Sequence, residues 1–272
     1  MPAPPPIEDT PMEPTDSPTP GPAYRRLADD LRTAIATGEY PPGSTLPKIT
    51  DLAEQYGITK QTAREAITLL EEEGLVEVVR RRGTVVRAVP ERQRISRTRH
   101  VYRDDRGYFF DLTAQPWIAL RPTTADWGPA PRDIAAILGI TPGSEVLIRD
   151  RLMGTPDTHE PTQLATSYLP ASIARGTRLA TLDTGPGGIY DRLELDLGHG
   201  PLNWHETIGS RMPTPTEATD LNLPKGTPLL RIVRTATSPA GVIVEINDTR
   251  MSADKFELGH AITRHPSADP AV

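Results

Sequence analysis

The order of hydrophobic patterns between residues 23 and 89 constrains the fold more than any other feature of this sequence. Apolar side chains recur at three- and four-residue steps in three successive segments, which predicts three short amphipathic helices. A glycine placed to end each helix follows it, namely Gly38, Gly57 and Gly74. Two short β-type runs come next, Leu75–Val79 and Thr84–Val89. This order predicts a winged helix-turn-helix domain over residues 23–89.

The first turn of the third predicted helix carries the side chains that we expect to contact DNA. The apolar positions of this helix face the core, so Lys60, Gln61 and Arg64 fall on the opposite face. Arginine suits the N7 and O6 atoms of guanine, and glutamine suits adenine. Thr59, the predicted N-cap, and Thr62 are suited to a phosphate at the helix N-terminus. We therefore expect this face to contact double-stranded DNA.

The turn between the two β-type runs is strongly basic. Arg80, Arg81 and Arg82 precede Gly83, and glycine permits a tight turn. Arginines at the tip of such a hairpin can enter a minor groove or contact phosphates. A single exposed arginine is usually only solvated, but three beside the polar face of a helix favour DNA contact.

The net charge of the chain is −6, which by itself does not suggest a DNA-binding protein. The charge is unevenly distributed, however, because residues 80–106 hold ten arginines against three acidic residues, giving +7 there and −13 elsewhere. Attraction to phosphate acts over about 8 Å at physiological salt, so the local charge decides it. The alternative interpretation is a solvated linker, and we assign residues 90–106 to an arginine-rich linker.

The two ends of the chain and its composition limit the remaining possibilities. Residues 1–22 are rich in proline and poor in large apolar side chains, which predicts a disordered tail and no secretory signal. Residues 266–272 are predicted to be a second tail. The chain has no cysteine, which excludes disulfides and thiolate metal sites, and it lacks the roughly 18 to 20 apolar residues of a membrane span. We therefore expect a cytoplasmic protein with no membrane contact, no metal and no cofactor.

Residues 107–265 show β-type and helical runs in mixed order. Such an order predicts an α+β domain with a largely antiparallel sheet. The predicted strands are Tyr108–Leu112, Glu145–Met153, Gln163–Leu169, Asn203–Arg211, Pro228–Thr237 and Val242–Met251. The predicted helices are Pro131–Leu138, Gly188–Leu197 and Pro215–Leu221.

The segment LPKITDLAEQYGITKQTAREAITLLEEEGLVEVVRRRGTVV resembles the N-terminal domain of GntR-type regulators. The matching positions are Leu46-Pro47, Leu52-Ala53, Gly57-Ile58, Thr59-Lys60, Arg64-Glu65-Ala66, Gly74-Leu75 and Gly83. The family usually has a DNA-contacting arginine where this chain has Thr50, which can still bind a phosphate, and Lys60 replaces the commoner arginine and loses its bidentate geometry. The predicted DNA-binding residues are Thr50, Thr59, Lys60, Gln61, Thr62, Arg64, Arg80, Arg81, Arg82 and Gly83.

Six later segments resemble the ligand-binding domain of the HutC branch of that family, the UTRA domain, which has a chorismate-lyase-like fold. They are VLIRDRLM, TSYLP, GPGGIYDRLE, HETIGSRMPT, GTPLLRIVRT and GVIVEIND. The resemblance implies that the sheet and helix termini hold a small, usually anionic metabolite. The family often places a serine near Gly188, and the hydroxyl contact expected there is missing from this chain.

The chemistry of the residues in this domain also suggests an anion site. Arg149 and Arg151 alternate along a predicted strand, so they project from one face of the sheet and repel each other unless an anion lies between them. The candidates for that anion are a bound ligand and the carboxylates of Glu206 and Glu245. A glycine-rich segment precedes a predicted helix whose N-terminus suits an anion, although a simple strand-to-helix turn is the alternative. The predicted effector-binding residues are Arg149, Arg151, Ser167, Gly187, Gly188, Glu206, Arg211 and Glu245, with Arg250 as a further candidate.

Together these features predict a repressor that binds a pseudo-palindromic operator as a homodimer and is released by a small anionic metabolite. The flexible stretch 92–106 is expected to transmit the change. A ligand-independent architectural DNA-binding protein is the alternative from another class. An enzyme of chorismate-lyase-like fold is a further alternative, but His199, His205 and Glu206 lack the spacing of a zinc protease, so we expect no catalysis.

Overall fold

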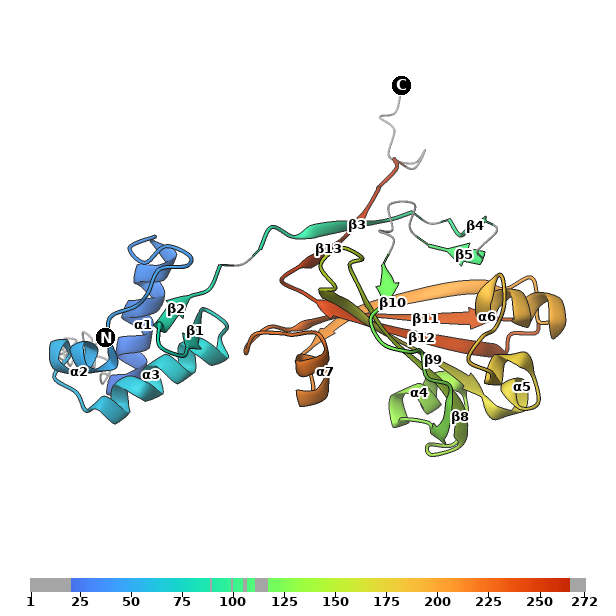
Figure 1. Ribbon diagram of the computed structural model, residues 1–272, viewed down its shortest axis with the longest axis horizontal. Coiled ribbons are helices and arrows are strands. Elements are labelled where there is room, and N and C mark those ends of the chain that lie inside the picture. The colour runs from blue at the N-terminus through green and yellow to red at the C-terminus, as the bar shows by residue number, and fades with distance from the viewer. Residues whose placement is uncertain (1–20, 89, 99, 105–106, 111–116, 265–272) are drawn as a thin grey trace, which may run out of the picture.

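A computed structural model describes residues 21–88, 90–98, 100–104, 107–110 and 117–264. The chain forms two lobes that are joined by an extended segment (Figure 1). Nearly all of the predicted N-terminal tail, the predicted C-terminal tail and the last two residues of the predicted strand Tyr108–Leu112 lie outside the described residues.

The N-terminal lobe is a winged helix-turn-helix domain, as predicted. Its elements are α1 (Ala23–Ala36), α2 (Ile49–Gln55), α3 (Lys60–Glu72), β1 (Val76–Val79) and β2 (Gly83–Val86). Leu27, Leu52, Leu70 and Val86 are at most 2% exposed and pack together, so all three helices and the hairpin share one core. None of the described helices in either lobe is long and apolar enough to span a membrane.

The C-terminal lobe is built on a seven-stranded sheet with the order β10-β11-β12-β9-β8-β6, and β7 also pairs with β8. The strands of this sheet pair antiparallel throughout the described residues. The strands are β6 (Ile118–Ala119), β7 (Asp126–Pro129), β8 (Glu145–Gly154), β9 (Pro161–Pro170), β10 (Asn203–Arg211), β11 (Leu229–Thr237) and β12 (Ile243–Ser252). The five long strands confirm the α+β prediction, whereas the two short ones were not predicted.

Helices cover both faces of this sheet because side chains alternate along each strand. Leu147 and Leu169 pack on one face against α5, η1 and α6 with its continuation η2, and Val146 and Tyr168 pack on the other against α4. Leu164 on that second face contacts Leu221, which directly follows α7. The helices are α4 (Arg132–Leu138), α5 (Ala171–Ala174), the 3-10 turn η1 (Arg178–Ala180), α6 (Gly188–Asp191), the π-helical turn η2 (Arg192–Asp196) and α7 (Pro215–Asp220).

The segment predicted to be a linker contains two strands and lies against the C-terminal lobe. Strand β3 (Gln93–Arg97) pairs in parallel with β13 (Phe256–His260), and β4 (Tyr102–Asp104) pairs with β5 (Gly107–Phe109). Ile95 is 7% exposed and packs with Met251 and Phe256, so one apolar side chain anchors β3 to the sheet. A single buried isoleucine among arginines gives no periodic signal, which is why the sequence predicted a flexible stretch here.

Candidate functional site

The start of α3 presents the predicted base-contacting side chains outward. Thr59 caps the helix, since its Oγ1 accepts a 3.1 Å hydrogen bond from the Thr62 amide. Lys60, Gln61 and Arg64 are exposed. The opposite face of the helix is sealed in the core by Ala63, Ala66, Ile67 and Leu70. The first turn of α3 is therefore held rigidly while its polar face stays accessible.

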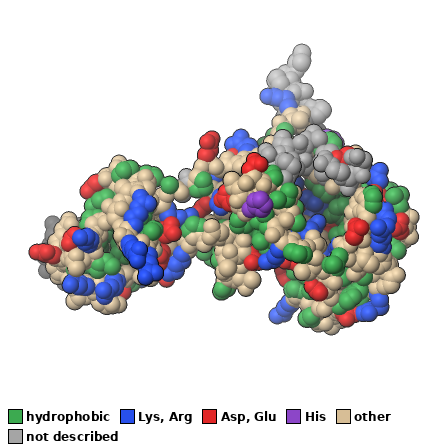
Figure 2. All heavy atoms as spheres, in the orientation of Figure 1, with side chains coloured by type: hydrophobic (Ala, Val, Ile, Leu, Met, Phe, Trp, Pro, Cys, Tyr) green, Lys and Arg blue, Asp and Glu red, His purple; other side chains and the backbone are tan. Residues whose placement is uncertain are grey.

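These outward side chains form few hydrogen bonds or ion pairs within the described residues. Gln61 donates a 3.3 Å hydrogen bond to Glu65, whereas within the described part of the chain Lys60 and Arg64 have no ion-pair partner. Thr50 is exposed near the start of α2, and its hydroxyl donates to Asp51 at 2.9 Å. Figure 2 shows several Lys and Arg side chains on the visible surface of the N-terminal lobe.

The wing has its three arginines at the tip of the β1–β2 hairpin. Val79 pairs with Gly83 in the ladder, which places the arginines in the connecting turn. Gly83 has φ of 100°, a value that favours glycine, and Arg81 also has a positive φ of 66°. Arg82 donates to the Gly43 carbonyl at 2.8 Å, which fixes the tip against the loop before α2. All three arginines are exposed, and they belong to the same domain as α3.

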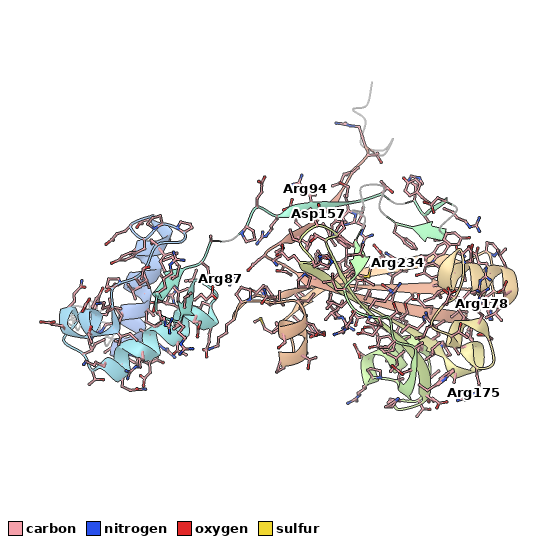
Figure 3. The ribbon with its side chains drawn as sticks, in the orientation of Figure 1. Arg87, Arg94, Asp157, Arg175, Arg178 and Arg234 are labelled. Atoms are coloured by element: carbon pink, nitrogen blue, oxygen red, sulfur yellow. The ribbon has the colours of Figure 1, made fainter. Side chains whose placement is uncertain are left out.

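The C-terminal lobe holds a cavity of about 370 Å³ between the sheet and the segments that cover it. Its floor comes from β8, β9, β11 and β12, and its cover comes from β3, the aromatic residues near β5 and the start of α6. Figure 3 shows Arg94 on β3 and Arg234 on the sheet. The predicted residues that line the cavity are Arg151, Ser167, Gly187, Gly188 and Glu245.

The cavity floor carries a short hydrogen-bonded chain across three strands. Asn247 donates to Ser167 Oγ at 3.1 Å, and Thr249 donates to Asn247 Oδ1 at 2.8 Å. Arg151 makes only a long 3.4 Å contact with Ser167, and its Nε has no hydrogen-bond partner among the described residues. The Arg151 guanidinium thus retains one buried donor, its Nε, that nothing in the described part of the protein satisfies.

Glu245 is the acidic group of the floor and is 1% exposed. Burial raises its pKa to about 7, because desolvation disfavours the carboxylate, and the bond from Ser167 and the charges of Arg234 and Arg151 oppose this rise only in part. Tyr190 donates a 3.2 Å hydrogen bond to Glu245 Oε2, and burial raises the pKa of that phenol as well. At neutral pH the floor therefore carries less negative charge than its composition suggests.

Arg234 projects into the cavity and is held in place by Glu206 and Phe110. Its Nε donates to Glu206 Oε1 at 2.9 Å, and its guanidinium carbon lies 3.4 Å from the centre of the Phe110 ring. Glu206 also lies 3.8 Å from Arg97 of β3. Glu206 does not line the cavity, but it positions two arginines that do.

The glycine-rich segment before α6 allows two backbone segments to touch. Gly107 of β5 forms a bridge with Gly187, and a Cβ on Gly107 would lie 2.7 Å from the Gly187 carbonyl oxygen. Arg103 holds Asp191, at the end of α6, with a 2.7 Å ion pair. The close approach requires glycine at position 107, and the positive φ values of Gly187 and Gly188, 84° and 69°, favour glycine in the turn before α6.

Comparisons with known proteins agree with this architecture. Residues 23–86 match the model of the bacterial regulatory proteins of the gntR family, and residues 122–257 match the UTRA domain. An HTH-type transcriptional regulator of Streptomyces coelicolor is 32% identical over 238 residues, which cover 82% of this chain and 86% of that protein. The chain belongs to the GntR family of bacterial regulatory proteins.

Two further relatives extend along almost the whole of this GntR-family chain. The HTH-type transcriptional repressor NagR of Bacillus subtilis is 26% identical over 249 residues, covering 90% of this chain and 97% of that protein. A solved GntR-family transcriptional regulator superposes with a TM-score of 0.62 at 28% identity, covering 90% of this chain and 99% of the other. The GntR and UTRA resemblances seen in the sequence are thereby confirmed.

Besides Glu206, two more of the predicted effector residues of this GntR-family regulator, Arg149 and Arg211, lie outside the cavity. Arg149 projects from the same sheet face as Arg151, but it is 5% exposed and donates to the carbonyls of Leu179 and Leu182 at 2.8 Å and to Thr181. Main-chain carbonyl groups therefore accept the hydrogen bonds of the Arg149 guanidinium, which turns away from the cavity. Arg211 lies elsewhere, where it forms two 2.7 Å bonds to Glu217.

The further candidate Arg250 is also engaged outside the cavity. It extends toward the sheet face that carries α4 and α7, where it donates to Glu217 at 3.2 Å and to the Thr166 hydroxyl. The Glu217 carboxylate thus bonds both Arg211 and Arg250, and these contacts hold the pKa of Glu217 at about 2 despite burial.

Several cavity residues of the regulator were not predicted. Tyr190, Arg234 and Asn247 come from the floor and the wall, and Gln93, Arg94 and Arg97 come from β3. The alternation of Arg234 with Ile232 and Ala236 was a usable signal, because it places that arginine on the buried face of a strand. The β3 residues gave no such signal, since the packing of the linker depends on a partner strand near the other end of the chain.

Proposed function

We propose that this protein is a transcriptional repressor that binds operator DNA through α3 and the wing and leaves it when a small anionic metabolite occupies the cavity. The observation that carries this proposal is the cavity itself, which is lined by four arginines inside a UTRA domain. Repression is supported by the name of NagR, a repressor that aligns with 90% of this chain. We infer a regulator without a catalytic step, because the relatives are regulators.

The charge balance of the cavity favours an anion. Arg94, Arg97, Arg151 and Arg234 line it, and Glu245 is its one acidic lining residue among those described. Burial raises the pKa of Glu245 to about 7, so part of its negative charge is lost at neutral pH. Arg151 lines the cavity and its Nη2 makes only a long 3.4 Å contact with Ser167, so a carboxylate or phosphate oxygen could engage this guanidinium. The polar floor made by Ser167, Asn247 and Thr249 suits the hydroxyl groups of such a metabolite.

DNA recognition follows from the helix-turn-helix geometry. The N-terminal turn of a recognition helix contacts base edges in the major groove, and Arg64 and Gln61 suit guanine and adenine there. The arginines at the wing tip supply phosphate or minor-groove contacts. Helix-turn-helix proteins read two half-sites about one helical turn apart, so we propose that a homodimer binds a pseudo-palindrome.

The following experiment tests the function. Duplexes that bind the full-length protein are selected from a random library, and their affinity is measured with glucose 6-phosphate, gluconate or uncharged glucose at constant ionic strength. Thermal shifts with the same three compounds report binding to the protein, and light scattering reports its oligomeric state. We expect an anionic probe, but not glucose, to raise Tm and weaken duplex binding.

The control variants separate specific from general effects of charge. Arg151→Ala is expected to lose the response to the anion, whereas Arg132→Ala, an exposed arginine of α4 away from the cavity, is expected to keep it. A protein that binds a selected duplex but shows the same affinity with every probe would support the ligand-independent alternative. A protein that selects no duplex would contradict DNA binding itself.

A further inference from the structure

The two lobes contact each other directly beside the point where the wing ends. A Cβ placed on Gly226 would lie 2.5 Å from the Gly74 nitrogen, so the turn after α3 and the turn before β11 touch backbone to backbone. Lys225 in the same turn forms a 3.2 Å ion pair with Glu71 of α3. The contact therefore uses the far end of α3 and leaves its N-terminal turn accessible.

Arg87 lies at the centre of this junction, as Figure 3 shows. Its side chain is 8% exposed, and it donates to the Gly74 carbonyl at 3.0 Å and to Thr227 Oγ1 at 2.9 Å. It also forms an ion pair with Asp254, whose Oδ2 accepts a 3.1 Å hydrogen bond from Thr227. We call Arg87, Thr227 and Asp254 the interdomain clasp.

Two chain segments lead from the clasp into the effector cavity. Strand β3 begins at Gln93, a few residues after Arg87, and supplies cover residues. Strand β12 supplies floor residues and ends at Ser252, next to Asp254. The Gln93 amide donates to the Lys255 carbonyl at 2.8 Å, which ties the two segments together beside the clasp. The clasp is therefore connected to the cavity twice, through β3 in the cover and through β12 in the floor.

We propose that the interdomain clasp fixes the orientation of the DNA-binding domain and couples it to the cover of the cavity, an inference that rests on the proposed function of that cavity. Arg87 is the positioning residue of this device. A buried guanidinium that loses its carboxylate partner is strongly destabilised, so opening of the clasp costs free energy and the closed clasp is favoured. Movement of β3 at the cavity changes the free energy of opening the clasp. Opening of the clasp in turn changes the position of β3, because coupling between two sites is reciprocal.

The absence of cysteine in the chain allows a direct test of the orientation. Spin labels are placed on the full-length protein at Thr68→Cys in α3 and Ala136→Cys in α4, both exposed positions. The labelled protein is mixed with excess unlabelled protein so that distances within one chain dominate, and the distance is measured by pulsed electron paramagnetic resonance. We expect one narrow distance distribution in the labelled parent. Arg87→Ala and the near-isosteric Asp254→Asn are each expected to broaden it. Arg92→Ala removes an exposed linker arginine outside the clasp and is expected to leave it narrow.

Hydrogen exchange tests the coupling to the cavity without any ligand. In Arg87→Ala and Asp254→Asn we expect exchange at the paired amides of β3 and β13 to accelerate at least about tenfold, while β9 in the floor stays unchanged. Faster exchange throughout the chain in one variant would indicate unfolding, and the other variant then decides. A distance distribution that stays narrow in both clasp variants, or β3 exchange equal to that of the parent, would overturn the proposal. Neither measurement requires DNA or effector, so a failure of the clasp is distinct from a failure of the repressor function.

Discussion

The Tyr190 hydroxyl donates a 3.2 Å hydrogen bond to the Glu245 carboxylate at the floor of the effector cavity. Glu245 is enclosed there, and burial raises its pKa from an ordinary 4.5 to about 7. Between these two values the folded protein binds more protons than the unfolded chain, so Glu245 makes the free energy of unfolding decrease as the pH rises from about 4.5 to about 7.

Glu245→Gln removes this titration. We expect the variant to be more stable than the parent at pH 8 by about 3 kcal/mol and nearly equal to it at pH 4.5. Urea unfolding of both proteins across this pH range gives the difference. An equal free energy of unfolding at pH 8 would show that the carboxylate is ionised without cost in the folded protein.

We expect Glu217 to have the opposite effect, which is a loss of stability as the pH falls. Its pKa is lowered to about 2 by hydrogen bonds from Arg211 and the Thr214 amide and by the charge of Arg250, so its contribution is present above 4.5 and lost as the pH falls toward 2. Relative to the parent, Glu217→Gln is expected to be less stable at neutral pH and to lose less stability between pH 4.5 and 2. Parallel acid-unfolding curves for the two proteins would contradict this assignment.

We expect substitutions of Arg149 and Arg151 to affect stability and anion binding differently, although both side chains project from one face of the sheet. Arg149→Ala leaves the buried Leu179 carbonyl and the partly buried carbonyls of Thr181 and Leu182 without this donor and should cost about 2–4 kcal/mol of stability. Arg151→Ala removes a side chain whose Nε donor is unsatisfied and should change stability by less than about 0.5 kcal/mol while abolishing stabilisation by an anionic probe. Thermal unfolding with and without gluconate or glucose 6-phosphate compares the two. Unchanged anion stabilisation in Arg151→Ala would remove that residue from the site.

Arg64→Ala should weaken binding to a selected duplex by about 1–3 kcal/mol and relax the preference at one base pair. The reason is that Arg64 lies exposed on the first turns of α3 and has no ion-pair partner within the described residues. Arg132→Ala, an arginine of the other lobe, serves as the matched control. If the two variants bound with the same affinity and preference, the assigned face of α3 would be wrong.

The wing arginines should contribute mainly through phosphate charge. Arg80→Ala and Arg81→Ala are each expected to reduce the slope of log K against log salt by about 1 without changing the sequence preference. Titrations of a selected duplex at several salt concentrations measure this slope. A changed base preference would indicate that the wing reads bases instead.

Much of the architecture was predictable because the signals are local. The buried faces of the helices and of the long strands appear as periodic patterns, and the N-cap at Thr59 and the turn at Gly83 are specified by single residues. The wing and α3 are close in sequence, so their joint surface was predictable as well.

The effector site was predictable only in part, since its geometry depends on distant contacts. Nothing near Arg149 in the sequence indicates that carbonyls of residues 179–182 will accept from it, and nothing near Arg250 indicates that it will engage Glu217. Strand β3 pairs with β13 from the other end of the chain, and only that pairing brings Arg94 and Arg97 over the cavity.

The affinity of the full-length protein for a selected duplex, with and without the anion that most raises its Tm, tests anion-controlled DNA release most directly. We expect the anion to raise the Kd of the parent by roughly 5- to 150-fold and that of Arg151→Ala by less than about twofold at the same ionic strength. A Kd that is the same with and without the anion in the parent, or that rises equally in Arg151→Ala, would contradict control of DNA binding through this cavity.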